Sequence, residues 1–255
     1  MTYQVEGAHA VVTGGGTGIG LAIARTLADA GMRVTIMGRT RARLETAARS
    51  LGQDAVAVVC DVTDDAAVDA AFSDAARRGT VRVLVNNAGA VETASLAKTT
   101  PAVWRRMLDV NVTGALLCQQ QVLPAMRADG AGRIVNIAST AALTGYAYVA
   151  AYVAAKHALL GLTRATAREV VSSGVTVNAV CPGYTDTAIV ARSIEVITAK
   201  TGRSADAARA ALVATNPQGR LITPEEVAAA VRYLVGPEAG SVTGQALVLA
   251  GGELM

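Results

Sequence analysis

Short apolar runs rich in β-branched residues alternate with longer segments of helical period along most of this chain. The runs are continuously apolar, which is typical of strands covered on both faces. They span residues 9–13, 33–37, 55–60, 81–85, 133–138, 175–180 and 246–249. The helices expected between them span 18–30, 40–51, 64–78, 101–127, 150–171 and 224–235. Repeated strand-helix-strand units predict a single α/β domain over residues 1–255, a doubly wound parallel sheet of about seven strands with helices on both faces.

The composition excludes several classes of protein. Apolar residues make up 52% of the chain and charged residues 17%, so the chain is not disordered. The net charge of +3 gives no electrostatic reason to expect a nucleic-acid partner. The longest charge-free run, 134–155, carries too many polar side chains for a good membrane span, so we expect no membrane partner.

The cysteines and the N-terminus point to the compartment. The three cysteines, at positions 60, 118 and 181, are odd in number and widely spaced. They fit neither a disulfide framework nor a metal cluster, so we expect a reducing cytoplasm and no metal site. The first seven residues lack the basic and apolar regions of a targeting segment, and none is expected.

One segment breaks the alternation. Residues 185–216 are long, Ala-rich and inserted before the last helix. An insertion of this size in a compact domain is usually functional, so we expect a lid segment that covers a substrate. Its apolar residues suggest an apolar pocket, although at helical spacing they could equally pack within the segment: Ile189, Val190, Ile194, Val196, Ile197, Leu212 and Val213.

The first strand leads directly into a glycine-rich turn, Thr13-Gly14-Gly15-Gly16-Thr17-Gly18-Ile19-Gly20, and a helix follows. A turn of this kind lets the backbone approach a pyrophosphate, which then sits at the positive end of the helix. We therefore expect a dinucleotide cofactor held by Gly14, Thr17, Gly18 and Ile19.

The end of the second strand indicates which dinucleotide binds. NAD sites place an acidic residue here to bind the ribose hydroxyl, but this chain reads Gly38-Arg39. Arg39 offers a charged fork that suits a 2′-phosphate, so we expect NADP(H), although a surface arginine could also be idle. Other cofactor contacts are expected where the third and fourth strands end, from Asp61, Val62, Asn87, Ala88 and Gly89.

Tyr152 and Lys156 are four residues apart in a helical segment and share one face. A phenol has an ordinary pKa of about 10, and a neighbouring ammonium and an oxidised nicotinamide both favour the phenolate. Ser139 follows the fifth strand, where its hydroxyl could hold a substrate carbonyl, although a serine there could also be a turn residue. Asn111 could be an ordinary buried polar group.

Taken together and in order, these elements resemble the short-chain dehydrogenase/reductase family, from about residue 5 to the end. They are the 13–20 turn, Asn-Asn-Ala-Gly at 86–89, Asn111, Ser139, Tyr-x-x-x-Lys at 152–156, and Pro182-Gly183 followed by Thr185 and Thr187. The resemblance implies a Rossmann-type fold.

The resemblance also implies roles for the matching residues. Tyr152 would be the general acid/base, Ser139 would polarise the carbonyl, and Lys156 would bind the nicotinamide ribose and lower the Tyr152 pKa. Asn111 would support a water-linked proton relay, and the Pro182, Gly183, Thr185 and Thr187 turn would cover the nicotinamide. Two departures stand out: Ala250 replaces a frequent Asp, and Thr17 replaces a basic residue that many NADP-using members carry.

The implied activity is NADP(H)-dependent hydride transfer between nicotinamide and a carbonyl or secondary alcohol. The 216–220 and 242–246 segments resemble 3-oxoacyl thioester and polyketide ketoreductases, so an apolar ketone, possibly linked to an acyl carrier protein or CoA, is the expected substrate. Three alternatives stay open. They are an NAD(H)-dependent secondary alcohol or 3-hydroxyacyl-CoA dehydrogenase, a non-catalytic NADP sensor, and an epimerase or dehydratase. The apolar helices at 101–127 and 150–171 need cover on more than one side. The resemblance implies that chains pair through them into a homotetramer.

Overall fold

A seven-stranded parallel sheet forms the centre of the computed structural model, which describes residues 6–254 apart from the side chains of Ile189 and Lys200. Its strand order is β3-β2-β1-β4-β5-β6-β7. This confirms the predicted doubly wound sheet, because the order reverses direction after β1. The strands are β1 (His9–Thr13), β2 (Arg33–Gly38), β3 (Ala55–Val59), β4 (Val81–Asn86), β5 (Gly132–Ile137), β6 (Val175–Pro182) and β7 (Ala246–Leu249).

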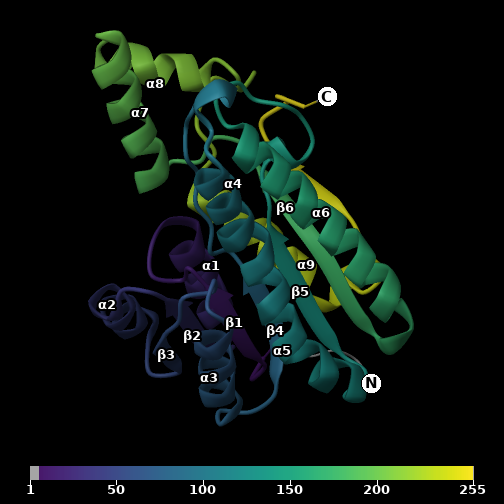
Figure 1. Ribbon diagram of the computed structural model, residues 1–255. Coiled ribbons are helices and arrows are strands. Elements are labelled where there is room, and N and C mark those ends of the chain that lie inside the picture. Colours follow the sequence, from purple (N-terminus) through teal and green to yellow (C-terminus); the bar gives the residue numbers. More distant parts are fainter. Residues whose placement is uncertain (1–5, 255) are drawn as a thin grey trace.

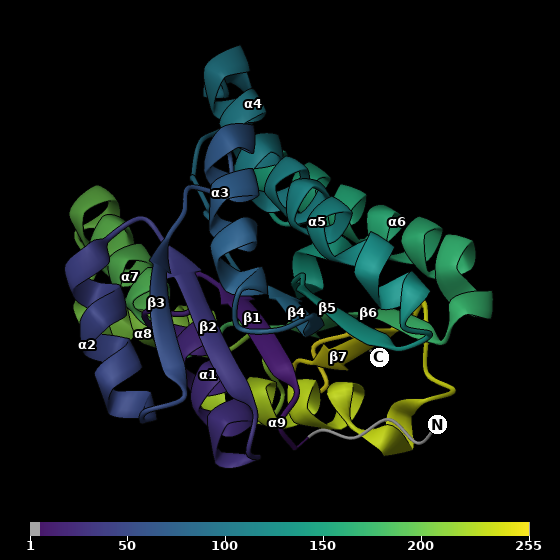
Figure 2. The same ribbon diagram turned by 90° about the horizontal axis from the view of Figure 1, so that it is seen from below.

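Helices cover both faces of the sheet (Figure 2). One face carries α1 (Gly18–Asp29), α2 (Arg41–Leu51) and α9 (Pro224–Val235). The other carries α3 (Asp65–Ala76), α5 (Gly114–Ala128) and α6 (Ala150–Val170), and α4 (Pro101–Leu108) packs on α6. Each layer buries its own apolar cluster against the strands, which is why β1 and β6 are buried along their whole length. Within residues 6–254, no helix combines the length and the apolar character needed to cross a bilayer.

The helix expected over 101–127 is interrupted. A π-helical turn at Asp109–Thr113 separates α4 from α5. In this turn the side chain of Asn111 donates to the Met107 carbonyl oxygen, at 2.9 Å, and to the Ala90 oxygen outside the helix, also at 2.9 Å. Such bulges often occur at functional sites, and this one directs Asn111 toward the loop after β4.

Residues 185–216, where the sequence predicts a lid, contain two helices, α7 (Ala188–Thr201) and α8 (Ala205–Val213), which stand at one end of the molecule beyond the sheet (Figure 1). Within this segment Val190 and Ala208 are buried, so part of its apolar content packs internally. An ion pair between Arg209 and Asp186, at 3.5 Å, connects α8 back to the start of the segment.

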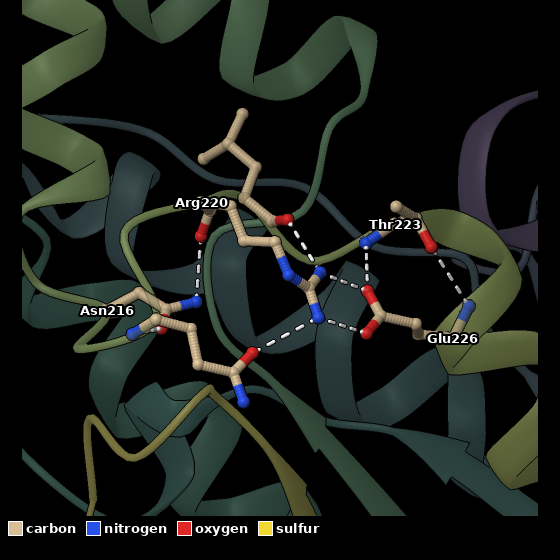
Figure 3. A network of polar contacts seen from close by, with 6 residues as sticks. Asn216, Arg220, Thr223 and Glu226 are labelled. Carbon is tan, nitrogen blue, oxygen red and sulfur yellow. Dashed lines mark hydrogen bonds and ion pairs between the residues drawn. The ribbon is translucent and has the colours of Figure 1, made fainter.

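A polar turn joins α8 to α9 (Figure 3). Asn216 accepts from the Gln218 N–H and donates to the Arg220 carbonyl oxygen, both at 2.8 Å. Arg220 makes a two-point contact with Glu226, at 2.7 and 2.6 Å. Thr223 and Glu226 form a capping box that starts α9. The Asn216–Arg220 motif, which suggested a substrate class from the sequence, therefore has a structural role in this fold.

Three buried polar side chains hold β4 and β5 to α6. Asn86 of β4 donates to the Asn136 side-chain oxygen at 2.9 Å, and Asn136 of β5 donates to the Thr163 hydroxyl at 2.8 Å. Asn136 and Thr163 are fully buried. These bonds fix α6 against the strand that leads to Ser139.

Thr163→Val keeps the shape of the side chain but leaves the buried Asn136 amide without its acceptor. We expect a loss of about 1–3 kcal/mol in the free energy of unfolding, measured by urea denaturation. Thr163→Ser keeps the hydroxyl, so its loss in the free energy of unfolding should be smaller than that of Thr163→Val. Equal losses for the two variants would contradict this role of the hydrogen bond.

Candidate active site

The glycine-rich turn and the end of β4 are joined by one threonine and one asparagine. The Thr13 hydroxyl accepts from the backbone N–H groups of Asn87 and Ala88, both at 3.0 Å. The Asn87 side chain donates to the carbonyl oxygens of Thr13, at 3.0 Å, and Gly14, at 3.2 Å. Asn87, predicted as a cofactor contact, therefore also shapes the turn itself.

The turn leaves no space for a side chain at Gly14, Gly15 or Gly20. A Cβ on Gly20 would lie 2.3 Å from the Gly14 oxygen, and Gly14 itself has a φ of +65°. Thr17 precedes α1 as its N-cap, yet its side chain makes no capping hydrogen bond. The first N–H groups of α1 are thus left for an anion, and Thr17 and Gly18 are exposed. These features fit the pyrophosphate of a dinucleotide.

A cavity of about 250 Å³ lies beside the ends of β2 and β3, where the sequence predicts cofactor contacts. It is lined by Arg39, Asp61, Thr63, Ala102, Arg105, Arg106, Asp109 and Val110. Arg39 is exposed and forms no hydrogen bond or ion pair within residues 6–254, so its charge is free for a ligand. Val62, also predicted here, is buried against Gly114.

Arg105 is a candidate that the sequence analysis missed. It lines the same cavity as Arg39 and, in the described part of the chain, has no ion-pair partner, whereas its neighbour Arg106 pairs with Glu92. No sequence signal sets it apart, because one arginine in a helical segment resembles any other.

Ser139 and Tyr152 meet at the end of β5. Ser139 begins a short 3-10 turn over Thr140–Ala142, and its hydroxyl oxygen accepts from the Ala141 N–H at 3.1 Å. Burial raises the pKa of Tyr152 to about 12, and a hydrogen bond with Ser139 opposes that rise. The protein's own groups therefore keep Tyr152 protonated.

Lys156 lies one turn beyond Tyr152 on α6. Its Nζ donates to the Ile137 carbonyl oxygen at 2.9 Å and is 5.6 Å from the centre of the Tyr152 ring. Burial lowers the pKa of Lys156 to about 8. The sequence predicted that this ammonium lowers the Tyr152 pKa. Here burial raises that pKa, and the hydrogen bond with Ser139 is what opposes the rise.

Asn111 and Lys156 approach the same glycine. A Cβ built on Gly89 would lie 2.9 Å from the Asn111 side-chain oxygen and 3.6 Å from the Lys156 Nζ. Asn111 is buried, and besides its two donated bonds it accepts from the Ala90 N–H at 3.3 Å. Its side chain thus has a structural role in holding the loop after β4. This agrees with the alternative that Asn111 is an ordinary buried polar group.

The turn after β6 lies across the glycine-rich turn. Gly183 donates its N–H to the Leu249 oxygen at 2.9 Å. The Thr185 hydroxyl donates to the Gly183 oxygen at 3.0 Å, and the Thr187 hydroxyl donates to the Thr185 oxygen at 3.2 Å. A Cβ on Gly18 would lie 3.4 Å from the Thr187 methyl carbon, so the base of α7 adjoins the site expected for the cofactor.

The predicted site residues therefore gather along one edge of the sheet, at the carboxyl ends of the first six strands, β1 to β6. In open α/β sheets this edge is where ligands bind. Among residues 6–254, no three His, Cys, Asp or Glu side chains come together as metal ligands would.

Comparisons with known proteins agree with this geometry. Residues 8–196 match the family model for short chain dehydrogenase. The chain is 40% identical over 249 residues to a putative ketoacyl reductase of Streptomyces coelicolor, covering 95% of each chain. It is 35% identical over 253 residues to the 3-oxoacyl-[acyl-carrier-protein] reductase FabG of Vibrio cholerae, covering 99% of each. It is 42% identical over 248 residues to the cis-4-hydroxycyclohexanecarboxylate dehydrogenase of Sinomonas cyclohexanicum, covering 95% of each.

A solved structure is also similar. It is that of a variant actinorhodin polyketide ketoreductase with NADPH, with a TM-score of 0.94 and 39% identity, covering 98% of each chain. The family match, the relatives and this structure all extend over most of the chain, and the protein therefore belongs to the short-chain dehydrogenase family.

Proposed function

We propose that this protein is an NADP(H)-dependent ketoreductase, an oxidoreductase that interconverts a ketone and a secondary alcohol. The observation that carries the proposal is the hydrogen-bonded pair of Ser139 and a protonated Tyr152, with Lys156 one helical turn away. A reduction needs a proton donor at the carbonyl oxygen, and a neutral phenol supplies one.

The cofactor supplies the hydride when it is bound. The chain's own residues would do the rest. The Ser139 hydroxyl holds the substrate oxygen, and Tyr152 passes its proton to that oxygen as the carbonyl carbon is reduced. Lys156 binds the nicotinamide ribose and supports the phenolate that results. Asn111 supports a proton relay to Lys156.

The rest of the edge described above would hold NADP(H). The glycine turn accepts the pyrophosphate and Arg39 the 2′-phosphate. The full set of cofactor contacts that we propose is Gly14, Thr17, Gly18, Ile19, Arg39, Asp61, Val62, Asn87, Ala88, Gly89, Tyr152, Lys156, Pro182, Gly183, Thr185 and Thr187.

The substrate is proposed to be a 3-oxoacyl thioester or another apolar ketone, possibly carrier-linked, with the lid segment over residues 185–216 closing on it. Two relatives named for ketoacyl reduction support this class. A relative named for oxidising an alicyclic alcohol supports a secondary alcohol dehydrogenase as the second candidate. The experiment measures reduction rates for a panel of 3-oxoacyl thioesters and simple ketones from the fall in NADPH absorbance. These rates decide between the two candidate functions.

The free, buried cysteines suit a cytoplasmic location.

Arg39 should determine cofactor choice. NADPH should give a kcat/KM at least tenfold above that of NADH, about 1.4 kcal/mol of discrimination. Arg39→Asp combined with Thr40→Ala should erase or reverse the preference, because a carboxylate repels the 2′-phosphate. Equal kcat/KM for both cofactors in the wild type would refute the assignment.

Tyr152→Phe removes only the titratable hydroxyl. We expect kcat to fall by roughly 10²–10⁴, while NADPH affinity, measured by fluorescence titration, changes less than about threefold. Lys156→Ala should lower both kcat and NADPH affinity, because it removes the ribose contact in addition to the support for the phenolate. If Tyr152→Phe retains most of its turnover, Tyr152 is not the proton donor.

Assembly is proposed to be a homotetramer. Trp104 on α4 and Leu116 on α5 are exposed although large and apolar, so these helices have apolar surface left to cover. Light scattering at micromolar concentration should give about 104 kDa, four times the 25.9 kDa of one chain. A mass of one chain would contradict this.

A further inference from the structure

A second polar cluster lies next to the catalytic serine, and none of the roles above uses it. The Tyr146 hydroxyl is 2.6 Å from Glu253 Oε1 and 2.8 Å from the Thr140 Oγ1. Thr140 directly follows Ser139, while Glu253 belongs to the tail after β7. The fold thus brings a carboxylate from the tail to the catalytic end of β5.

The direction of these two hydrogen bonds follows from counting protons. An ionised carboxylate can only accept, and Tyr146 has a single hydroxyl proton. Tyr146 therefore donates to Glu253, and the Thr140 hydroxyl donates to Tyr146. Burial and this bond to Glu253 both raise the pKa of Tyr146, so it stays a neutral donor. The chain of bonds ends on a negative charge.

That charge lies close to the expected reaction centre. The second oxygen of Glu253, Oε2, is 3.0 Å from the position of a Cβ on Gly183, in the turn proposed to cover the nicotinamide. Burial and the charge of Glu253 raise the pKa of Tyr184, and Tyr184 in turn raises that of Tyr152. Glu253 therefore acts electrostatically on the group of tyrosines around the catalytic hydroxyl.

The carboxylate is not neutralised by a cation. Among the side chains that the structure describes, no arginine, lysine or histidine pairs with Glu253. It is half-buried, so solvent screens it only in part. A second negative charge placed beside it would be repelled more strongly than in water.

We infer that Glu253 is a specificity-determining residue whose carboxylate restricts the enzyme to ketones without a negative charge near the carbonyl. Esters, thioesters and amides of 3-oxo acids fit this restriction, while the free 3-oxo acids do not. The inference rests on the proposed ketoreductase activity and narrows its substrate class.

The test compares two substrates of nearly equal shape that differ in charge, 3-oxobutanamide and 3-oxobutanoate, at neutral pH with NADPH. The measured quantity is the ratio of kcat/KM for the amide to that for the acid. Glu253→Gln keeps the side-chain size and the acceptor for Tyr146 but removes the charge. We expect it to lower the ratio at least tenfold, about 1.4 kcal/mol, mainly through faster reduction of the acid. Glu238→Gln, which removes an exposed carboxylate outside the site, should leave the ratio unchanged.

A further variant separates charge from structure. Tyr146→Phe breaks the bond to Glu253 but keeps the carboxylate, so it should preserve the discrimination against the acid. If Tyr146→Phe and Glu253→Gln lower the ratio equally, Glu253 acts only by holding Tyr146, and the inference fails. It fails also if Glu253→Gln reduces the amide normally and leaves the ratio unchanged, and in that case the ketoreductase activity stands. A wild type that reduces no neutral ketone would overturn both proposals.

Discussion

The hydrogen bonds from Asn86 to Asn136 and from Asn136 to Thr163 are the interaction on which the catalytic half of the molecule depends. They lie within an apolar core, where an unpaired amide would cost about 1–3 kcal/mol, so they favour one placement of α6 over neighbouring ones. That placement matters because Ser139 follows β5 whereas Tyr152 and Lys156 lie on α6. A shift of the helix along the sheet would separate the hydroxyl groups while leaving the apolar packing largely satisfied.

Burial then sets the protonation of the two groups on α6. Removing a side chain from water disfavours its charged form, which raises the pKa of Tyr152 to about 12 and lowers that of Lys156 to about 8. Both shifts favour the neutral forms. A neutral phenol suits the reducing direction, in which Tyr152 gives up a proton, and the charge of an oxidised nicotinamide would favour the phenolate needed for the reverse.

The sequence was sufficient to predict the seven strands, because buried parallel strands are continuously apolar and bounded by turns. It also located the glycine-rich turn between β1 and α1 and the Tyr152–Lys156 pair on α6, whose motifs are local. It could not predict the π-helical turn at 109–113, since that depends on a hydrogen bond from Asn111 to Ala90, twenty-one residues away. The contact between Tyr146 and Glu253 could not be predicted for the same reason. The two residues are 107 positions apart, and only the folded tail brings them together.

The two ends of the proposed site carry opposite charges. Arg39 and Arg105 line the cavity at the end proposed for adenosine, where the 2′-phosphate of NADP(H) would add negative charge. Glu253 lies at the other end, beside the turn proposed to cover the nicotinamide. In the proposed arrangement, such a distribution orients an anionic cofactor with its phosphate toward the arginines and disfavours a substrate with a negative charge near the reacting carbonyl. One relative is named for a substrate that bears a carboxylate. That carboxylate lies across the ring from the carbon that bears the hydroxyl. The name of this relative is therefore compatible with the proposed role of Glu253, which concerns only charge near the reacting carbonyl.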